Sequence, residues 1–191
     1  MGTVLFSVVA GFGVSITGYY TPFMIFGAAL LVTSATLITT WTVSTPAAMW
    51  IGYQVLFGAG AGLGIQQAHT AAQAVLAVAD VPTGAVVLIF SQILGGTVWI
   101  SVAQNVFTGH LLKGLATTVP GLDPKSVLDT GATGLRSVVF DTQSLGGVLA
   151  VYNFALTRTF FSAVGLAAVA LLASTGMEWK SVKGPKPENG T

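Results

Sequence analysis

The first charged side chain in this 191-residue sequence is Asp80. A soluble domain has roughly one charged residue in four, so a stretch of this length would carry on the order of twenty. The whole chain is only 7% charged and 53% hydrophobic. A chain so poor in charge cannot cover a water-exposed surface. This excludes an ordinary soluble globular domain and predicts a protein that lies in a lipid bilayer.

Long apolar runs predict an all-α integral membrane protein with about five transmembrane helices. A bilayer core about 30 Å thick needs about 20 mostly apolar residues in a helix, whereas a membrane barrel shows alternating stretches of about ten residues. Residues 1–112 are expected to hold four spans with short connections, 113–150 an extracytosolic loop with short packed or interfacial helices, 151–177 the last span, and 178–191 a flexible cytosolic tail. The five expected spans are residues 2–18, 22–41, 47–67, 84–112 and 152–177.

Prolines and one acidic residue mark the breaks between these spans. Pro22, Pro46 and Pro82 stand where helices are expected to begin, and proline suits the first turn of a helix. Asp80 precedes Pro82 and is expected to cap the fourth span through its side chain. Three lysines follow the last span, so the positive-inside rule favours a cytosolic tail.

Several kinds of chemistry are excluded by missing residues. The chain has no cysteine, hence no disulfide, thiolate metal site or cysteine nucleophile. Neither His69 nor His110 has a carboxylate within four residues, and no G-x-S-x-G motif occurs. We therefore expect no catalytic residues, no metal and no cofactor. Basic residues begin only at Lys113, which argues against nucleic acid as a partner.

Four glycines give the third expected span its densest pattern: Gly58, Gly60, Gly62 and Gly64. Gly58 and Gly62 form one small-xxx-small pair, and Gly60 and Gly64 form a second pair about 200° around the helix. Two sides of this helix can therefore approach neighbouring backbones. A nucleotide-binding loop needs other glycine spacings or a following lysine, so close helix packing is the favoured interpretation.

A polar stripe follows these glycines, with Gln66, His69, Thr70 and Gln73 at the spacing of one helix face. Amides in hydrocarbon are costly unless they are paired, so Gln66 is a candidate lining residue for a substrate pathway. Histidine is the side chain that most readily gains and loses a proton near neutral pH, so His69 is a candidate proton carrier. Ordinary polarity at a helix end is the alternative interpretation of both.

The fourth expected span carries a second polar face, made of Gln92, Gly95, Gly96, Trp99 and Ala103. Gln92 supplies a hydrogen-bonding group and Trp99 an aromatic wall, which makes them candidate substrate contacts. The alternative is an interhelical hydrogen bond from Gln92 above a tight helix contact at Gly95 and Gly96.

Several stretches of this sequence resemble fungal multidrug efflux transporters of the major facilitator superfamily, in the fourteen-span drug:proton antiporter group. The resemblance runs nearly from end to end. It rests on GFGVSITGYYTP (residues 11–22), GYQVLFGAGAGLGIQQ (52–67), DVPTG (80–84), FSQILGG (90–96), SVAQNVF (101–107) and MEWKSVK (177–183).

The resemblance implies a partial bundle of about the last five spans of such a transporter. It further implies export of small, largely apolar molecules by proton antiport, coupling residues in missing N-terminal spans, and no transport by the isolated chain. At one position, where the family commonly has an arginine, this sequence has Ile16. The implied location is the plasma membrane, with the vacuolar membrane as the alternative. A small helical scaffold or regulatory protein without transport activity is the alternative function.

Overall fold

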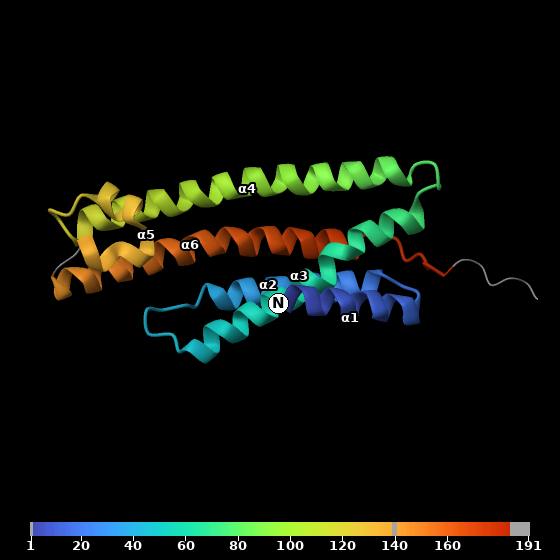
Figure 1. Ribbon diagram of the computed structural model, residues 1–191, viewed down its shortest axis with the longest axis horizontal. Helices are drawn as coiled ribbons and strands as arrows, with labels where there is room; N and C mark the ends of the chain where they lie inside the picture. Colours follow the sequence, from blue (N-terminus) through green and yellow to red (C-terminus); the bar gives the residue numbers. More distant parts are fainter. Residues whose placement is uncertain (1, 139–140, 184–191) are drawn as a thin grey trace, which may run out of the picture.

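The computed structural model describes residues 2–138 and 141–183, and it is built of helices (Figure 1). By length and composition α2, α3, α4 and α6 can cross a membrane, while α1 is apolar but has only 16 residues, about 24 Å. The predicted all-α membrane fold is confirmed, with four long spans and one shorter apolar helix where five spans were expected. The helices are α1 (Gly2–Thr17), α2 (Thr21–Ile38), α3 (Ala47–Val75), α4 (Val81–Thr118), α5 (Pro124–Val138) and α6 (Thr142–Thr175).

The helices form two packed groups that α2 joins. Helix α3 packs on both α1 and α2, and α6 packs on both α2 and α4. Helices α4 and α6 extend alongside each other in Figure 1 and contact each other, and α5 lies beside them at one end. Helix α4 has few contacts with α3, so much of its surface is exposed within the described chain.

Hydrogen bonds tie segments together at both ends of the bundle. At one end the Asn153 side chain of α6 donates to the carbonyl of Trp41 after α2, at 2.9 Å. At the other end Tyr20, in the turn between α1 and α2, donates to the carbonyl of Glu178 after α6, at 2.6 Å. The segment after α6 therefore lies at the same end as the α1–α2 turn, and the α2–α3 turn lies at the opposite end.

Two clusters of buried side chains form the core. One lies where α5 covers the ends of α4 and α6, and the other lies where α1 and α2 meet α3. Each cluster consists of aliphatic or aromatic side chains. Outside the lipid, the burial of such side chains away from water is the main favourable contribution to folding. The first cluster is Leu111, Leu115, Val127, Leu135, Val148, Val151 and Ala155, and the second is Val14, Tyr20 and Ala71, with Phe23, Ala74 and Met177 packed against it.

Helices α3 and α4 are longer than the sequence predicted. Helix α3 was expected to end at Gln67 but continues to Val75, because residues 68–75 are rich in alanine and contain neither proline nor glycine. Helix α4 continues past Leu112 to Thr118, where Leu115 is fully buried against α5 and α6. The predicted ends were placed where the sequence becomes polar, although the helical hydrogen bonding continues beyond these points.

The stretch 113–150, expected as a loop with short helices, is mostly helical. It contains the end of α4, the whole of α5 and the start of α6. Helix α6 begins ten residues before the expected Tyr152, because the Asp141 side chain caps it by accepting from the Ser144 amide at 2.9 Å. Helix α5 is interrupted at Gly131, whose φ of 67° is a left-handed conformation that glycine adopts easily.

The connections only partly follow the expected cap chemistry. Pro22 and Pro82 stand in the first turns of α2 and α4, as predicted. The Asp80 side chain, however, makes no cap hydrogen bond, so that prediction is wrong. Its backbone is helical, with φ −96° and ψ −12°, whereas a capping side chain needs an extended residue. Gly18 ends α1 at φ 78°, and its amide donates to the Val14 carbonyl at 2.7 Å.

Candidate functional site

A cavity of about 1030 Å³ lies among α2, α3, α4 and α6. Its lining is apolar along most of its length, and its polar residues gather at the end of the bundle that holds the α1–α2 and α3–α4 turns. A volume of this size is at the upper end of the range that small-molecule sites occupy. The lining residues are Tyr20, Met24, Ala28, Leu31, Gly64, Ile65, Ala68, Ala71, Ala72, Val75, Leu76, Asp80, Thr83, Gly84, Val87, Leu88, Ala170, Ala173, Ser174, Gly176, Met177 and Glu178.

Small side chains create this space. Gly64, Ala68 and Ala72 recur every four residues on α3 and therefore share one face. Ala170 and Ala173 line the cavity from α6. Residues this short leave room between helices that longer aliphatic side chains would fill. The arrangement suits a ligand held by apolar contact and shape.

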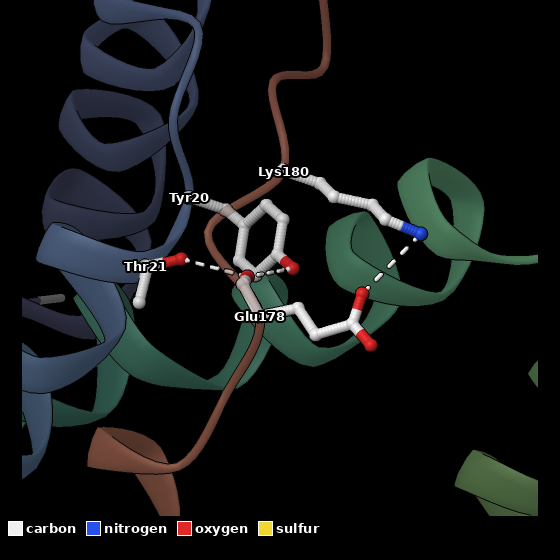
Figure 2. Close-up of polar contacts among 4 residues, drawn as sticks. All are labelled: Tyr20, Thr21, Glu178 and Lys180. Carbon is white, nitrogen blue, oxygen red and sulfur yellow. Dashed lines mark hydrogen bonds and ion pairs between the residues drawn. The ribbon is translucent and has the colours of Figure 1, made fainter.

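Tyr20 forms the polar end of the cavity. Its side chain is fully buried, and its hydroxyl donates to the Glu178 carbonyl at 2.6 Å (Figure 2). The Thr21 hydroxyl donates to the same carbonyl at 3.3 Å, and Lys180 lies 3.3 Å from the Glu178 carboxylate. Asp80 lines the same end of the cavity from the α3–α4 turn. Two acidic residues, Asp80 and Glu178, therefore line the polar end of an otherwise apolar space.

The glycine run of α3 lies against two neighbouring helices. A Cβ on Gly60 would stand 2.8 Å from the Leu31 amide nitrogen and 2.9 Å from the Gly27 carbonyl oxygen of α2. A Cβ on Gly62 would overlap the Thr3 carbonyl oxygen of α1, and one on Gly58 would lie 3.3 Å from the Thr3 amide. The backbones touch on both sides of α3, with Gly58 and Gly62 facing α1 and Gly60 facing α2.

The remaining glycines of the sequence prediction stand in open space within the described chain. A Cβ on Gly64, Gly95 or Gly96 would meet no neighbouring atom within 4 Å. Gly64 still matters as a neighbour, because a Cβ on Gly27 would lie 2.9 Å from its amide nitrogen. Helix α4, which carries Gly95 and Gly96, presents this part of its surface away from the described core.

The candidate pathway residues lie outside the cavity. Gln66 and Gln92 are exposed, Trp99 and His69 are half-buried, and none of the four lines the cavity. The structure therefore does not bring these residues together into one site with the cavity. Gln66 lies next to the cavity residue Ile65 in sequence but is not itself in the lining.

Sequence reasoning missed Gln67, the most buried amide in the described chain. Gln67 is 1% exposed, and its Oε1 atom has no hydrogen-bond partner among the described residues. A signal was present, since Leu63, Gln67 and Ala71 recur every four residues and all three are buried. This buried face lies directly beside the polar stripe of Gln66, His69, Thr70 and Gln73.

The described ranges contain no cluster of His, Cys, Asp or Glu able to hold a metal ion. The one cationic side chain within α6 is Arg158, which lies over the ring of Phe154 at 4.8 Å and near Phe161 at 5.7 Å. These contacts leave Arg158 with aromatic partners at the surface of the bundle, away from the cavity lining.

Comparison with known proteins finds close relatives among fungal efflux pumps. The chain is 47% identical over 188 residues to the MFS-type efflux pump MFS1 of Arthroderma benhamiae, covering 98% of this chain and 35% of that protein. It is 46% identical over 180 residues to the MFS acetylaranotin efflux transporter ataA of Aspergillus terreus, covering 94% and 40%. It is 44% identical over 184 residues to the MFS-type transporter astH of Aspergillus oryzae, covering 96% and 32%.

No family model matches the chain, and no solved structure matches it either. The chain spans about a third of the length of the curated relatives that it matches. Identity of this level over nearly the whole chain, together with the apolar helices, shows a transporter family rather than an enzyme. The chain belongs to the major facilitator superfamily, and over nearly its whole length it is similar to one part of fungal efflux pumps of that superfamily.

Proposed function

We propose that this chain is the C-terminal part of an exporter of small, largely apolar molecules that works by proton antiport, and that it needs further spans to transport. The cavity of about 1030 Å³ carries this proposal. An apolar space open among four helices suits substrates recognised by shape and apolar area. Such transporters move substrates by rocking one bundle against another around a site near the bilayer midplane.

Proton coupling requires groups beyond those in this chain. The sequences of α1, α2, α3, α4 and α6 contain no Asp or Glu. A carboxylate within a span is the usual proton carrier in membrane pumps and transporters. In the proposed transporter the remaining spans supply these groups, and His69 of α3 is a secondary candidate.

Gln66, Gln92 and Trp99 are proposed to face the remaining spans. None of the residues in the most apolar 18-residue stretch of α4 is buried within the described chain. An amide such as Gln92 is costly in contact with lipid tails, so a protein partner or a watery pathway is the favoured neighbour. Gly95 and Gly96 lie on the same helix as Gln92, and because a Cβ on either would meet no atom within 4 Å, they allow another helix to approach α4 closely.

Binding of a lipophilic fluorescent dye to the purified chain in lipid nanodiscs tests the role of the cavity. Ala170→Trp places a large side chain in the lining and is expected to weaken binding by about tenfold, or about 1.4 kcal/mol. Val169→Trp is the matched control, because Val169 is the neighbouring residue, is 62% exposed and does not line the cavity. Equal dye affinity of the two variants would remove the cavity from the proposed pathway.

The orientation in the membrane is testable because the chain has no cysteine. We expect the α3–α4 turn and the segment after α6 on the cytosolic side and α5 on the other. Val78→Cys is at a site 90% exposed in the α3–α4 turn, and Lys125→Cys is at an exposed site of α5. An impermeant thiol reagent should label these single variants from opposite faces of a sealed vesicle. Labelling of both from one face would contradict this orientation.

A further inference from the structure

We propose that Glu178–Lys183 is a releasable strap that holds the polar end of the cavity closed. This inference rests on the proposed function in one respect, namely that the strap would gate the substrate pathway. The strap itself is defined by contacts between the segment after α6 and the α1–α2 turn (Figure 2). Release of these contacts would free Tyr20 and open the cavity beside Asp80.

The strap follows the α1–α2 turn through backbone pairing. The Val182 amide donates to the Gly18 carbonyl at 2.8 Å, and Ser181 forms an isolated antiparallel bridge with Tyr19. The Lys183 ammonium donates to the Ile16 carbonyl at the end of α1, where a positive charge complements the helix dipole. These contacts, spread along the strap, fix its register on the turn.

Gly18 makes this close approach compatible with the turn. Its φ of 78° ends α1, and a Cβ there would lie 3.2 Å from the Ser181 hydroxyl and 3.1 Å from the Lys183 side chain. Any other residue would be strained in this conformation and would crowd the strap. Gly18 therefore both ends α1 and leaves room for the strap to pack against the α1–α2 turn.

The strap is coupled to the cavity through Tyr20 and Glu178, which both line it. The Glu178 carbonyl accepts from the Tyr20 and Thr21 hydroxyls, so the residue that begins the strap also holds the tyrosine. Met177, directly before the strap, packs against the cluster that contains Tyr20. Movement of the strap must therefore disturb the wall of the cavity at this end.

The strap has little apolar burial to prevent its release. Trp179 is 63% exposed and Val182 is 36% exposed. The ion pair between Lys180 and Glu178 lies at the surface, with side chains 50% and 65% exposed, and exposed pairs contribute little. Segments held by a few exposed hydrogen bonds open far more readily than the core. The strap is thus a weakly held wall of the cavity.

Thiol labelling of the 191-residue chain in nanodiscs tests the gate. Ala72→Cys places a single cysteine in the cavity lining. Adding Tyr20→Phe and Thr21→Val removes both hydroxyl donors to Glu178 and is expected to raise the rate of labelling by a water-soluble maleimide about fivefold. Tyr53→Phe on α3, outside the cavity and the strap, is the matched control and should leave the rate unchanged.

Two further measurements decide the outcome without any transport assay. A chain that ends at Met177 should label at least as fast as the Tyr20→Phe, Thr21→Val variant, and the Val182 amide of the intact chain should be protected from hydrogen exchange. Circular dichroism checks that each variant keeps its helices. An unprotected Val182 amide, or equal labelling of the intact and weakened chains, would overturn the strap, whereas a failure of dye binding or export alone would not.

Discussion

Gly60→Ala and Gly62→Ala are each expected to destabilise the helix bundle by about 1 to 3 kcal/mol, the usual cost of overpacking. The added Cβ of Gly60→Ala would stand 2.8 Å from the Leu31 amide nitrogen, and that of Gly62→Ala would overlap the Thr3 carbonyl oxygen. Backbone atoms cannot rotate away as a side chain can, so α3 must move away from α2 or α1. Thermal unfolding in detergent, followed by circular dichroism, measures the loss.

Gly64→Ala on the same helix and Gly95→Ala on α4 are the matched controls. Neither new Cβ would meet an atom within 4 Å, and alanine favours a helix over glycine by about 0.5 to 1 kcal/mol. These variants should therefore unfold at the same temperature as the original chain or slightly higher. Ala59 is unsuitable as a neutral control because it is only 4% exposed. Equal destabilisation of all four glycine variants would contradict the close-contact account.

The sequence predicted the class of fold because the membrane imposes a simple rule. Apolar stretches of about 20 residues in lipid must be helical to satisfy their backbone hydrogen bonds. The absence of charge before Asp80 was therefore enough to predict helical spans. Prolines located the starts of α2 and α4 for a local reason. The amide hydrogen that proline lacks would have no partner within the helix at its first turn, so proline is tolerated there.

The helix ends were less predictable because hydrophobicity does not report where hydrogen bonding stops. Helix α3 runs eight residues beyond the expected Gln67, through a polar but alanine-rich stretch. The Asp141 cap that starts α6 lies in a stretch that looked like a loop. Local helix propensity and side-chain capping set these ends, and neither depends on the hydrophobicity of the stretch.

The strap and the cavity could not be predicted, because both depend on segments far apart in the sequence. Tyr20 and Glu178 are separated by 158 positions, and nothing local to either indicates the other. The residues after Met177 were expected to form a flexible tail, yet those up to Lys183 pair with the α1–α2 turn. Likewise the doubled glycine spacing on α3 predicted close packing, but only the folded structure identifies Gly27 of α2 as a residue that α3 packs against.

The second large effect is an expected one: we predict that this chain alone transports no substrate. The relatives are about three times longer, and alternating access needs two bundles around one site. The acidic and basic residues within the helices are few, and α1 to α3 contain none: they are Lys113 of α4, Lys125, Asp129 and Arg136 of α5, and Arg158 of α6. Without a carboxylate in a long span, a proton gradient has no group to act on except His69 or His110.

Reconstitution in liposomes with an imposed pH gradient and a lipophilic fluorescent dye tests this claim most directly. The purified 191-residue chain is predicted to move no dye above the rate of empty liposomes. Co-expression with the remaining spans of a relative such as the efflux pump MFS1 of Arthroderma benhamiae is predicted to restore gradient-dependent movement. Gradient-dependent dye movement by the chain alone, abolished by His69→Ala, would contradict the account and make His69 the coupling residue.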